Sequence, residues 1–178
     1  MRRTLLVTND FPPVVGGIQS YLDDYTSRLP ADDLVVLAST PPEGPQAARA
    51  FDETRTFEVV RVPTGMLLPT PRVRARMEHL IDARGIETVW VGAAAPLGLL
   101  GASARRAGAT RIIATTHGHE VGWSMVLGAR QMLRRIFRHA DVVTYISRYT
   151  LDELRPHMPA DQRVLHLPSG IDVERFLQ

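Results

Sequence analysis

The sequence predicts a doubly wound α/β fold, in which helices cover both faces of a mostly parallel sheet of about seven strands. Short apolar runs recur along the chain, and segments with helical spacing of their apolar residues lie between most of them. A run that is apolar at every position, such as residues 5–7, is typical of a strand buried on both faces. Alternation of strands and helices indicates a parallel sheet, because parallel strands need a crossover connection.

The first strand leads into a segment with two prolines and two adjacent glycines, Gly16 and Gly17. Apolar residues recur at helical spacing over residues 18–29, so a helix begins directly after the glycines. Glycines remove the side chains that would keep a ligand away from backbone N–H groups at the helix start, where anions bind well. The segment therefore predicts a phosphate or diphosphate site. A turn that needs glycine only for its geometry is the alternative interpretation.

The remaining elements follow in order. Further strands are predicted at residues 34–38, 57–62, 87–91, 111–115, 142–146 and 163–167, with 57–62 nearer an edge because it carries polar residues. Further helices are predicted at residues 73–81, 97–107, 128–140 and 147–155, the last capped by Ser147. Residues 41–50 are expected to form a surface loop, because prolines and glycine dominate their start.

Two of the predicted helices carry clustered arginines. In residues 128–140 we expect Met132, Leu133, Ile136 and Phe137 to point inward and Arg130, Arg134 and Arg138 to form an outer stripe. The other cluster combines the exposed-looking Met66, Leu67 and Leu68 with Arg72, Arg74 and Arg76 at a helix start. Cations there oppose the helix dipole, whereas apolar residues beside arginines suit an anionic membrane surface. A solvated charged helix under an ordinary loop is the alternative.

Composition excludes several functions. The 178 residues include no cysteine, which rules out disulfides, zinc-thiolate sites and thiol catalysis and is compatible with a reducing compartment. All 21 basic residues are arginine, the net charge is only +2, and aromatic content is 6% without a nucleic-acid-reading motif. Nucleic acid is therefore not an expected partner. The start lacks the core of a signal peptide, and residues 92–104 are too short for a membrane span.

The rim at the carboxyl ends of the strands is the predicted site. Ligands of such sheets bind there, which brings together the glycine segment, the loop after residue 91, residues 117–122, Ser147 and Arg148. The only dense polar cluster at a strand end is His117, His119 and Glu120, which could supply an acid, a base or a hydrogen-bond donor. No fourth metal ligand and no Asp-x-Asp pair accompany them, so no metal site is expected. Motifs for dinucleotides, hydrolase nucleophiles and P-loops are absent from the sequence as well.

Three segments in order resemble the retaining GT-B glycosyltransferases of family 4. FPPVVGGIQSYL at residues 11–22 resembles their glycine-rich loop, THGHE at 116–120 their central histidine segment, and PSGIDVERF at 168–176 their closing N-G-V-D-x-x-x-F element. The resemblance implies one Rossmann-like lobe of a GT-B fold, a single N-terminal, acceptor-side domain over residues 1–178. The second lobe, which in that family holds most of the nucleotide sugar, is expected to lie outside this sequence.

The same resemblance implies roles for residues. Gly16 and Gly17 would place backbone amides against the donor diphosphate, and His117 would contact the transferred sugar and the acceptor. The wording THGHEVGWS is especially similar to the actinobacterial phosphatidylinositol-monomannoside mannosyltransferases, which use GDP-mannose on a lipid acceptor at the cytoplasmic membrane face. No metal cofactor is expected. By position on the rim, Asn9, Asp10, Glu120 and Trp123 are candidate acceptor contacts.

The leading hypothesis is therefore the acceptor-binding half of a retaining, GDP-mannose-dependent mannosyltransferase acting on a phosphatidylinositol mannoside-type lipid, inactive without its second lobe. The expected location is the cytoplasm, peripheral to the inner face of the membrane. One alternative is a non-catalytic module that binds an anionic membrane through its arginine-rich helices. Another is a family 4 transferase that uses a different nucleotide sugar, such as UDP-glucose or UDP-GlcNAc, and a soluble acceptor.

Overall fold

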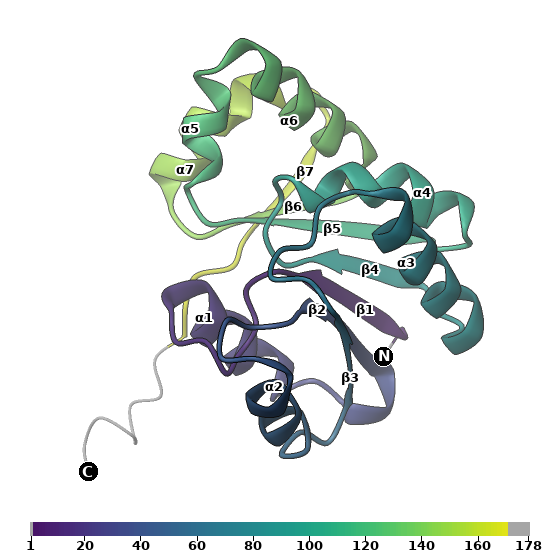
Figure 1. Ribbon diagram of the computed structural model, residues 1–178. Helices are drawn as coiled ribbons and strands as arrows, with labels where there is room; N and C mark the ends of the chain where they lie inside the picture. Colours follow the sequence, from purple (N-terminus) through teal and green to yellow (C-terminus); the bar gives the residue numbers. More distant parts are fainter. Residues whose placement is uncertain (1, 171–178) are drawn as a thin grey trace.

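The computed structural model describes residues 2–170, which form a seven-stranded parallel sheet with helices on both faces (Figure 1). The strands are β1 (Thr4–Thr8), β2 (Leu34–Ser39), β3 (Glu58–Val62), β4 (Thr88–Val91), β5 (Arg111–Thr116), β6 (Val142–Tyr145) and β7 (Arg163–His166). Their order is β3-β2-β1-β4-β5-β6-β7, and every neighbouring pair is parallel. The predicted fold class is confirmed, and β3 lies at an edge as expected.

The helices divide unequally between the two faces. They are α1 (Gly17–Thr26), α2 (Pro45–Asp52), α3 (Pro71–Arg84), α4 (Gly101–Arg106), α5 (Glu120–Ser124), α6 (Leu127–His139) and α7 (Arg148–Leu154), with 3-10 turns at Ala31–Asp33, Leu97–Leu100 and Arg155–His157. Apolar residues of α3, α4 and α6 pack on one face of the sheet. On the other face α1 is the main cover, with Phe51 of α2 packed beside it.

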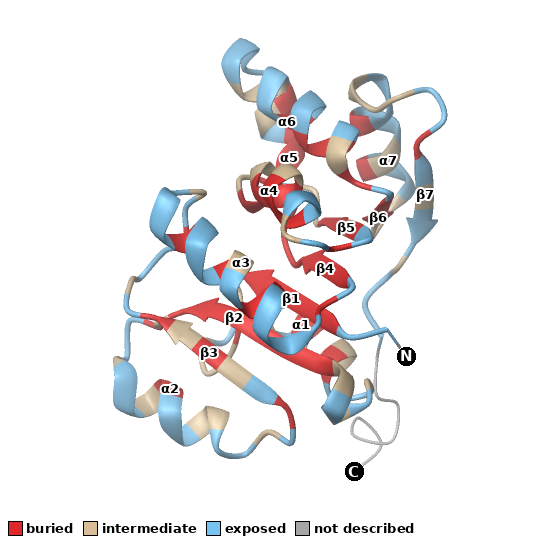
Figure 2. Cartoon of the chain, turned by 90° about the vertical axis from the view of Figure 1, so that its right-hand side faces the viewer, coloured by how far each residue is buried: buried red, intermediate tan, exposed pale blue. Residues whose placement is uncertain are grey.

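The central strands are buried along their whole length. Figure 2 shows β1, β2 and β4 as buried segments between exposed helices, and every residue of these three strands is buried. Alternation along β1 sends Leu5 and Val7 towards α3, and Leu6 towards α1. Burial on both faces explains why these strands are apolar at nearly every position.

Residues 41–50 are not simply a loop, as the sequence analysis expected. Helix α2 begins at Pro45, preceded by Gly44 with φ +95°, and continues through Ala47 and Ala48. Proline suits the first helical position because its missing N–H would be unpaired there in any case, and alanine favours the helix interior. The proline that looked like a loop residue is in fact the helix start.

Two predicted orientations are also wrong. Met132 of α6 is 45% exposed, whereas Leu133, Ile136 and Phe137 are buried as predicted. Leu67, expected to be exposed beside Met66 and Leu68, is fully buried in the cluster that includes α3. Alternating side chains in an extended segment point in opposite directions, which explains why Leu67 turns inward while both neighbours stay exposed.

The strand order reverses between β1 and β4. From β1 the chain first builds outward through β2 and β3, then returns to β4 on the other side of β1. Connections from adjacent strands leave in opposite directions at such a point and open a crevice at the carboxyl ends of the strands. Gly92 follows β4 there, and its N–H donates to the Val7 carbonyl oxygen at 3.0 Å.

The two faces of α6 predict different costs for shortening two of its side chains. Phe137→Ala is expected to lower the free energy of unfolding by about 3–5 kcal/mol, because it empties a fully buried volume. Met132→Ala, on the exposed side of the same helix, is expected to change it by less than about 0.5 kcal/mol. Urea unfolding of both variants is the measurement, and equal losses would contradict this assignment of faces.

Candidate functional site

The glycine segment ends in an open helix N-terminus. Gly16 precedes α1 in an extended conformation, no side chain caps the first turn, and that turn contains no acidic residue. A Cβ atom at Gly17 would meet no other atom within 4 Å, and one at Gly16 would meet the end of the Gln19 side chain. The N–H groups that begin α1 are therefore accessible, and the positive end of the helix dipole has no nearby carboxylate in its own first turn.

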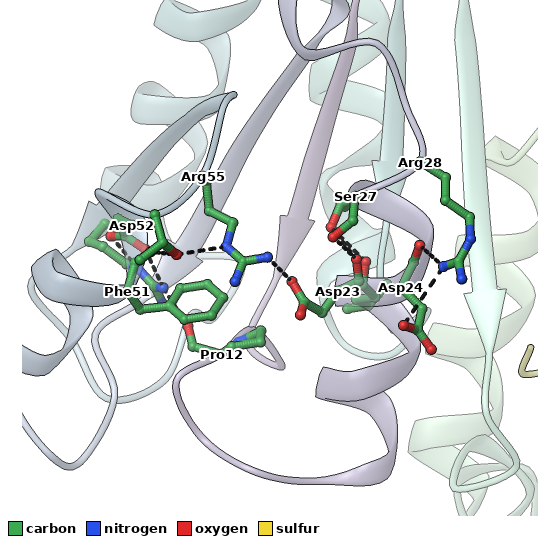
Figure 3. A network of polar contacts seen from close by, with 12 residues as sticks. Pro12, Asp23, Asp24, Ser27, Arg28, Phe51, Asp52 and Arg55 are labelled. Carbon is green, nitrogen blue, oxygen red and sulfur yellow. Dashed lines mark hydrogen bonds and ion pairs between the residues drawn. The ribbon is translucent and has the colours of Figure 1, made fainter. Parts of the chain in front are cut away.

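An ion-pair network holds the segment before these glycines. The mostly buried Arg61 of β3 donates to both carboxylate oxygens of Asp52, at 3.0 and 2.7 Å, and also to the carbonyl oxygens of Ser39 and Pro12. Nearby, Arg55 donates to Asp23 of α1 at 2.9 Å (Figure 3). A planar guanidinium that binds several oxygens at once fixes their relative positions. Arg61 and Arg55 thereby tie the glycine segment and α1 to β3 and the turn before it.

His117 follows β5 and faces the same end of the sheet. Its Nε2 lies 2.8 Å from the carbonyl oxygen of Gly92, and the edge of the Tyr21 ring packs against it with centroids 4.9 Å apart. A carbonyl can only accept, so Nε2 carries a proton and Nδ1 of the neutral ring is left to accept. Burial lowers the pKa of His117, so the ring is neutral at pH 7. Because Tyr21 belongs to α1, this ring contact places the imidazole beside the glycine helix.

Glu120 organises the turn that carries His117. Its fully buried carboxylate accepts the backbone N–H of His117 at 3.0 Å and of Gly118 at 3.2 Å. Gly118 has φ +99°, a conformation that favours glycine. The second oxygen of Glu120 lies 3.4 Å from Nε2 of His119, within ion-pair distance although the angle is not that of a hydrogen bond. A carboxylate without solvent exposure does not fit the acceptor contact that the sequence analysis suggested for Glu120.

Asp10 is the side chain that joins the two halves of the site. Its Oδ1 accepts from Nε2 of Gln19, in the first turn of α1, at 3.3 Å. Burial raises the pKa of Asp10, and the nearby His119 and His117 oppose that rise. Both imidazoles are therefore close enough to the Asp10 carboxylate to interact with its charge. Among the four rim candidates, Asp10 is thus the one that faces both the glycine helix and the histidines.

Asn9 and Trp123 have structural surroundings instead. The side-chain amide of Asn9 donates to the carbonyl oxygen of Leu67 and accepts its N–H, so both of its polar ends hold the segment before α3. Trp123 is half-buried against the apolar cluster that α6 and α7 form over β5 and β6. Each end of the Asn9 amide thus already has one partner in the frame of the site, and an acceptor contact by Asn9 stays a prediction.

Sequence reasoning missed three residues that shape the site. The Tyr21 ring contacts the His117 ring, and the carbonyl oxygen of Gly92 accepts a hydrogen bond from Nε2 of His117. Arg61 holds the segment before the glycines. A Cβ atom at Gly92 would lie 2.9 Å from atoms of both Thr8 and Leu22, so β1, α1 and β4 leave room only for glycine. A glycine directly after a buried strand at the reversal of strand order was the one available signal. Nothing in the sequence marks Tyr21 or Arg61 as different from packing and surface residues.

One mainly apolar hollow of the described residues lies elsewhere. It has a volume of about 460 Å³ and is lined mainly by apolar side chains, with Trp90, Ile113 and Leu165 on the sheet and Tyr25 on α1. None of the predicted site residues lines it. Within residues 2–170 no group of three or more histidine or acidic side chains is placed to hold a metal ion. Of the closing segment at 168–176, residues 171–176 lie outside the described residues.

A family model described as Glycosyltransferase Family 4 matches residues 15–175. The chain is 50% identical over 175 residues to the GDP-mannose-dependent monoacylated alpha-(1-6)-phosphatidylinositol monomannoside mannosyltransferase of Corynebacterium glutamicum, covering 98% of this chain and 45% of that protein. It is 51% identical to the GDP-mannose-dependent alpha-(1-6)-phosphatidylinositol monomannoside mannosyltransferase of Mycolicibacterium smegmatis, covering 97% of this chain and 45% of that protein. The chain thus spans less than half the length of these relatives.

Solved structures show the same fold at low identity. Anabaena HepE in complex with UDP and glucose aligns with a TM-score of 0.71 and 14% identity, over 98% of this chain and 46% of that one. Sucrose-phosphate synthase from Thermosynechococcus elongatus aligns with a TM-score of 0.74 and 15% identity, over 97% of this chain and 49% of that one. This likeness agrees with the Rossmann-like architecture described above.

The geometry around His117 predicts its tautomer and the direction of its titration. Nitrogen-15 shifts should show the proton on Nε2, and the pKa should lie below the ordinary value of about 6.5, because burial disfavours the charged ring. Half of the rings are then protonated only at a pH below that value. NMR titration of the chain, with His117→Gln to assign the signal, measures both. A proton on Nδ1 would show that the Gly92 contact does not govern this ring, and a pKa above 6.5 would show that burial does not dominate its titration.

Proposed function

Because this chain belongs to glycosyltransferase family 4, we propose that it is the acceptor-side domain of a retaining mannosyltransferase that moves mannose from GDP-mannose to a phosphatidylinositol mannoside-type lipid. The observation that carries the proposal is identity of about 50% over almost the whole chain to two such enzymes. The crevice between α1 and His117 supports it, because it combines an anion site with a polar group for a sugar hydroxyl.

In the proposed reaction, the bond between mannose C1 and the diphosphate oxygen breaks, and a bond from C1 to the acceptor hydroxyl oxygen forms. The hydroxyl proton passes to the released diphosphate. Negative charge therefore grows on the diphosphate during transfer. The open N–H groups at the start of α1 would stabilise that charge, since fixed donors in a crevice need no reorganisation.

His117 would act as a neutral hydrogen-bonding group. Its Nε2 proton is engaged with Gly92, so Nδ1 is the atom that can accept from a hydroxyl of the sugar or the acceptor. Asp10, which accepts from Gln19 in the first turn of α1, would accept from a second hydroxyl. Glu120 would contribute indirectly, by holding the turn on which His117 stands.

The proposal includes a second domain. The relatives are more than twice as long as the part that this chain matches. We propose that the second domain holds the nucleotide and most of the sugar, so that the isolated chain does not transfer mannose. No described helix is long and apolar enough to cross a bilayer. We place the protein at the cytoplasmic face of the membrane as a peripheral protein, because its proposed acceptor is a lipid.

Replacement of His117 tests the proposed chemistry. In the full-length protein that contains this domain, His117→Ala should lower kcat/KM for mannose transfer from GDP-mannose by roughly 100-fold or more, the usual scale for a lost polar group at a reacting centre. His79→Ala, at an exposed position of α3, is the matched control and should retain full transfer. Thermal unfolding confirms that both variants fold. Unchanged transfer by folded His117→Ala would remove His117 from the mechanism.

The accessibility of Gly17 gives a separate test of the donor site. A methyl group there meets no protein atom, so Gly17→Ala should fold normally, but it would stand between the α1 amides and a diphosphate. The KM for GDP-mannose should rise about tenfold, which corresponds to about 1.4 kcal/mol. Gly65→Ala, at an equally open position away from the crevice, should leave the KM unchanged. An unchanged KM for Gly17→Ala would place the donor elsewhere.

A further inference from the structure

Helix α6 presents a surface that the crevice does not use. We call it the α6 surface and define it by Met125, Val126, Leu127, Arg134, Arg135 and Arg138. Met125 and Val126 connect α5 to α6, and Leu127 is the first residue of α6. All three are 60–76% exposed, among the most exposed large apolar side chains that the structure describes. Exposed apolar residues in a row are costly in water, which indicates that something covers them in the working protein.

The apolar tip and the arginines lie along one line. Leu127, Arg134 and Arg138 are spaced i, i+7 and i+11, so they occupy the same side of a helix, opposite the buried Ile136. At 1.5 Å per residue the line extends for roughly 16 Å. Arg135 flanks it. The surface therefore has an apolar end and a basic side, and one flat partner can contact both at the same time.

The positive charge of this surface is uncompensated. Helix α6 contains no acidic residue, and none of the ion pairs within residues 2–170 involves Arg134, Arg135 or Arg138. The pKa values of His139 and His157 are lowered, first by burial and then by the positive charge of the neighbouring arginines. An anionic partner would gain from every one of these charges.

The arginine cluster of α3, which the sequence analysis suggested for membrane contact, differs on both counts. Arg74 of that cluster lies 3.8 Å from Glu78 of the same helix, so one of its three charges is compensated. The apolar part is reduced as well, because Leu67 is buried. Of the two clusters, the α6 surface is the more basic and the more apolar.

We propose that the α6 surface docks on an anionic phospholipid bilayer, with Met125, Val126 and Leu127 entering the interface and the three arginines facing lipid phosphates. This inference rests on the proposed function, which requires a lipid acceptor. Helix α5 leads from the turn of His117 directly to the apolar tip, so docking there holds the crevice beside the membrane (Figure 1). A second copy of the chain is a poor occupant, since facing α6 surfaces would bring like charges together. Bilayers suit this combination of insertion and charge.

Sedimentation with vesicles tests the basic part. The chain should bind vesicles of phosphatidylcholine with 30% phosphatidylglycerol, a fraction chosen as about one anionic lipid in three, and binding should weaken as salt rises. Replacing Arg134, Arg135 and Arg138 together by alanine should lower the partition coefficient roughly 100-fold, about fivefold per arginine. The matched control replaces Arg72, Arg74 and Arg76 by alanine, which removes the same charge from α3 and should lower binding by less than about fivefold.

Tryptophan probes test the apolar part. Emission of Leu127→Trp should shift to shorter wavelength when anionic vesicles are added, because the indole leaves water. Met66→Trp, at a position of similar exposure before α3, should show no such shift. Circular dichroism establishes that every variant is folded, as expected for changes at exposed positions.

Three results would overturn the inference: full vesicle binding by the folded α6 triple variant, an equal loss in the α3 triple variant, or no spectral shift for Leu127→Trp. Mannose transfer to a detergent-dispersed acceptor, measured in the full-length protein, separates this from the proposed function. If the α6 triple variant loses vesicle binding but keeps that transfer, both ideas are supported. Vesicle binding through α6 without any transfer activity in the unaltered protein would refute the proposed reaction and leave the docking surface standing.

Discussion

The parallel pairing of β1 with β4 is the constraint on which the site depends. The register that sets Val7 beside Val91 places the ends of both strands side by side, although more than 80 residues of chain separate them. Strand order reverses at this pair, so the glycine segment leaves in one direction and later strands are added in the other. The crevice between α1 and His117 follows from that reversal. It is a product of topology before any side chain contributes chemistry.

Rigid anchoring of the loops then turns the crevice into a site. Arg61 fixes the segment before Gly16, Asn9 fixes the segment before α3, and Glu120 fixes the turn of His117. Each anchor satisfies backbone groups that would otherwise lack partners in a partly buried loop. The start of α1 has no side-chain cap, and the neutral His117 ring keeps one nitrogen as an acceptor. Polar residues at the rim thus divide into those that hold the frame and those that remain available to a ligand.

Sequence patterns were sufficient to predict most of the fold, because the spacing of apolar residues and the positions of glycine and proline mark the strands and helices. All seven strands were placed to within a residue or two, and full burial makes β1, β2 and β4 almost continuous apolar runs. Helix α2 was missed because proline is common both in loops and at the first position of a helix, so Pro45 alone does not distinguish the two. Met132 and Leu67 were misassigned because hydrophobicity shows that a residue can be buried, whereas the tertiary contacts decide whether it is.

The site was less predictable than the fold. Gly16, Gly17 and His117 could be found from short motifs, but the separation of Asp10 from Asn9 and Glu120 required knowledge of their partners. At Gly92 the structure shows something that no local pattern contains. Three elements converge on its α-carbon so tightly that a methyl group is excluded, and its carbonyl oxygen orients the imidazole. Position 92 therefore couples the packing of the sheet to the orientation of His117 through two atoms of one residue, the α-carbon and the carbonyl oxygen. A substitution at Gly92 would therefore disturb the packing of the sheet and the orientation of His117 together.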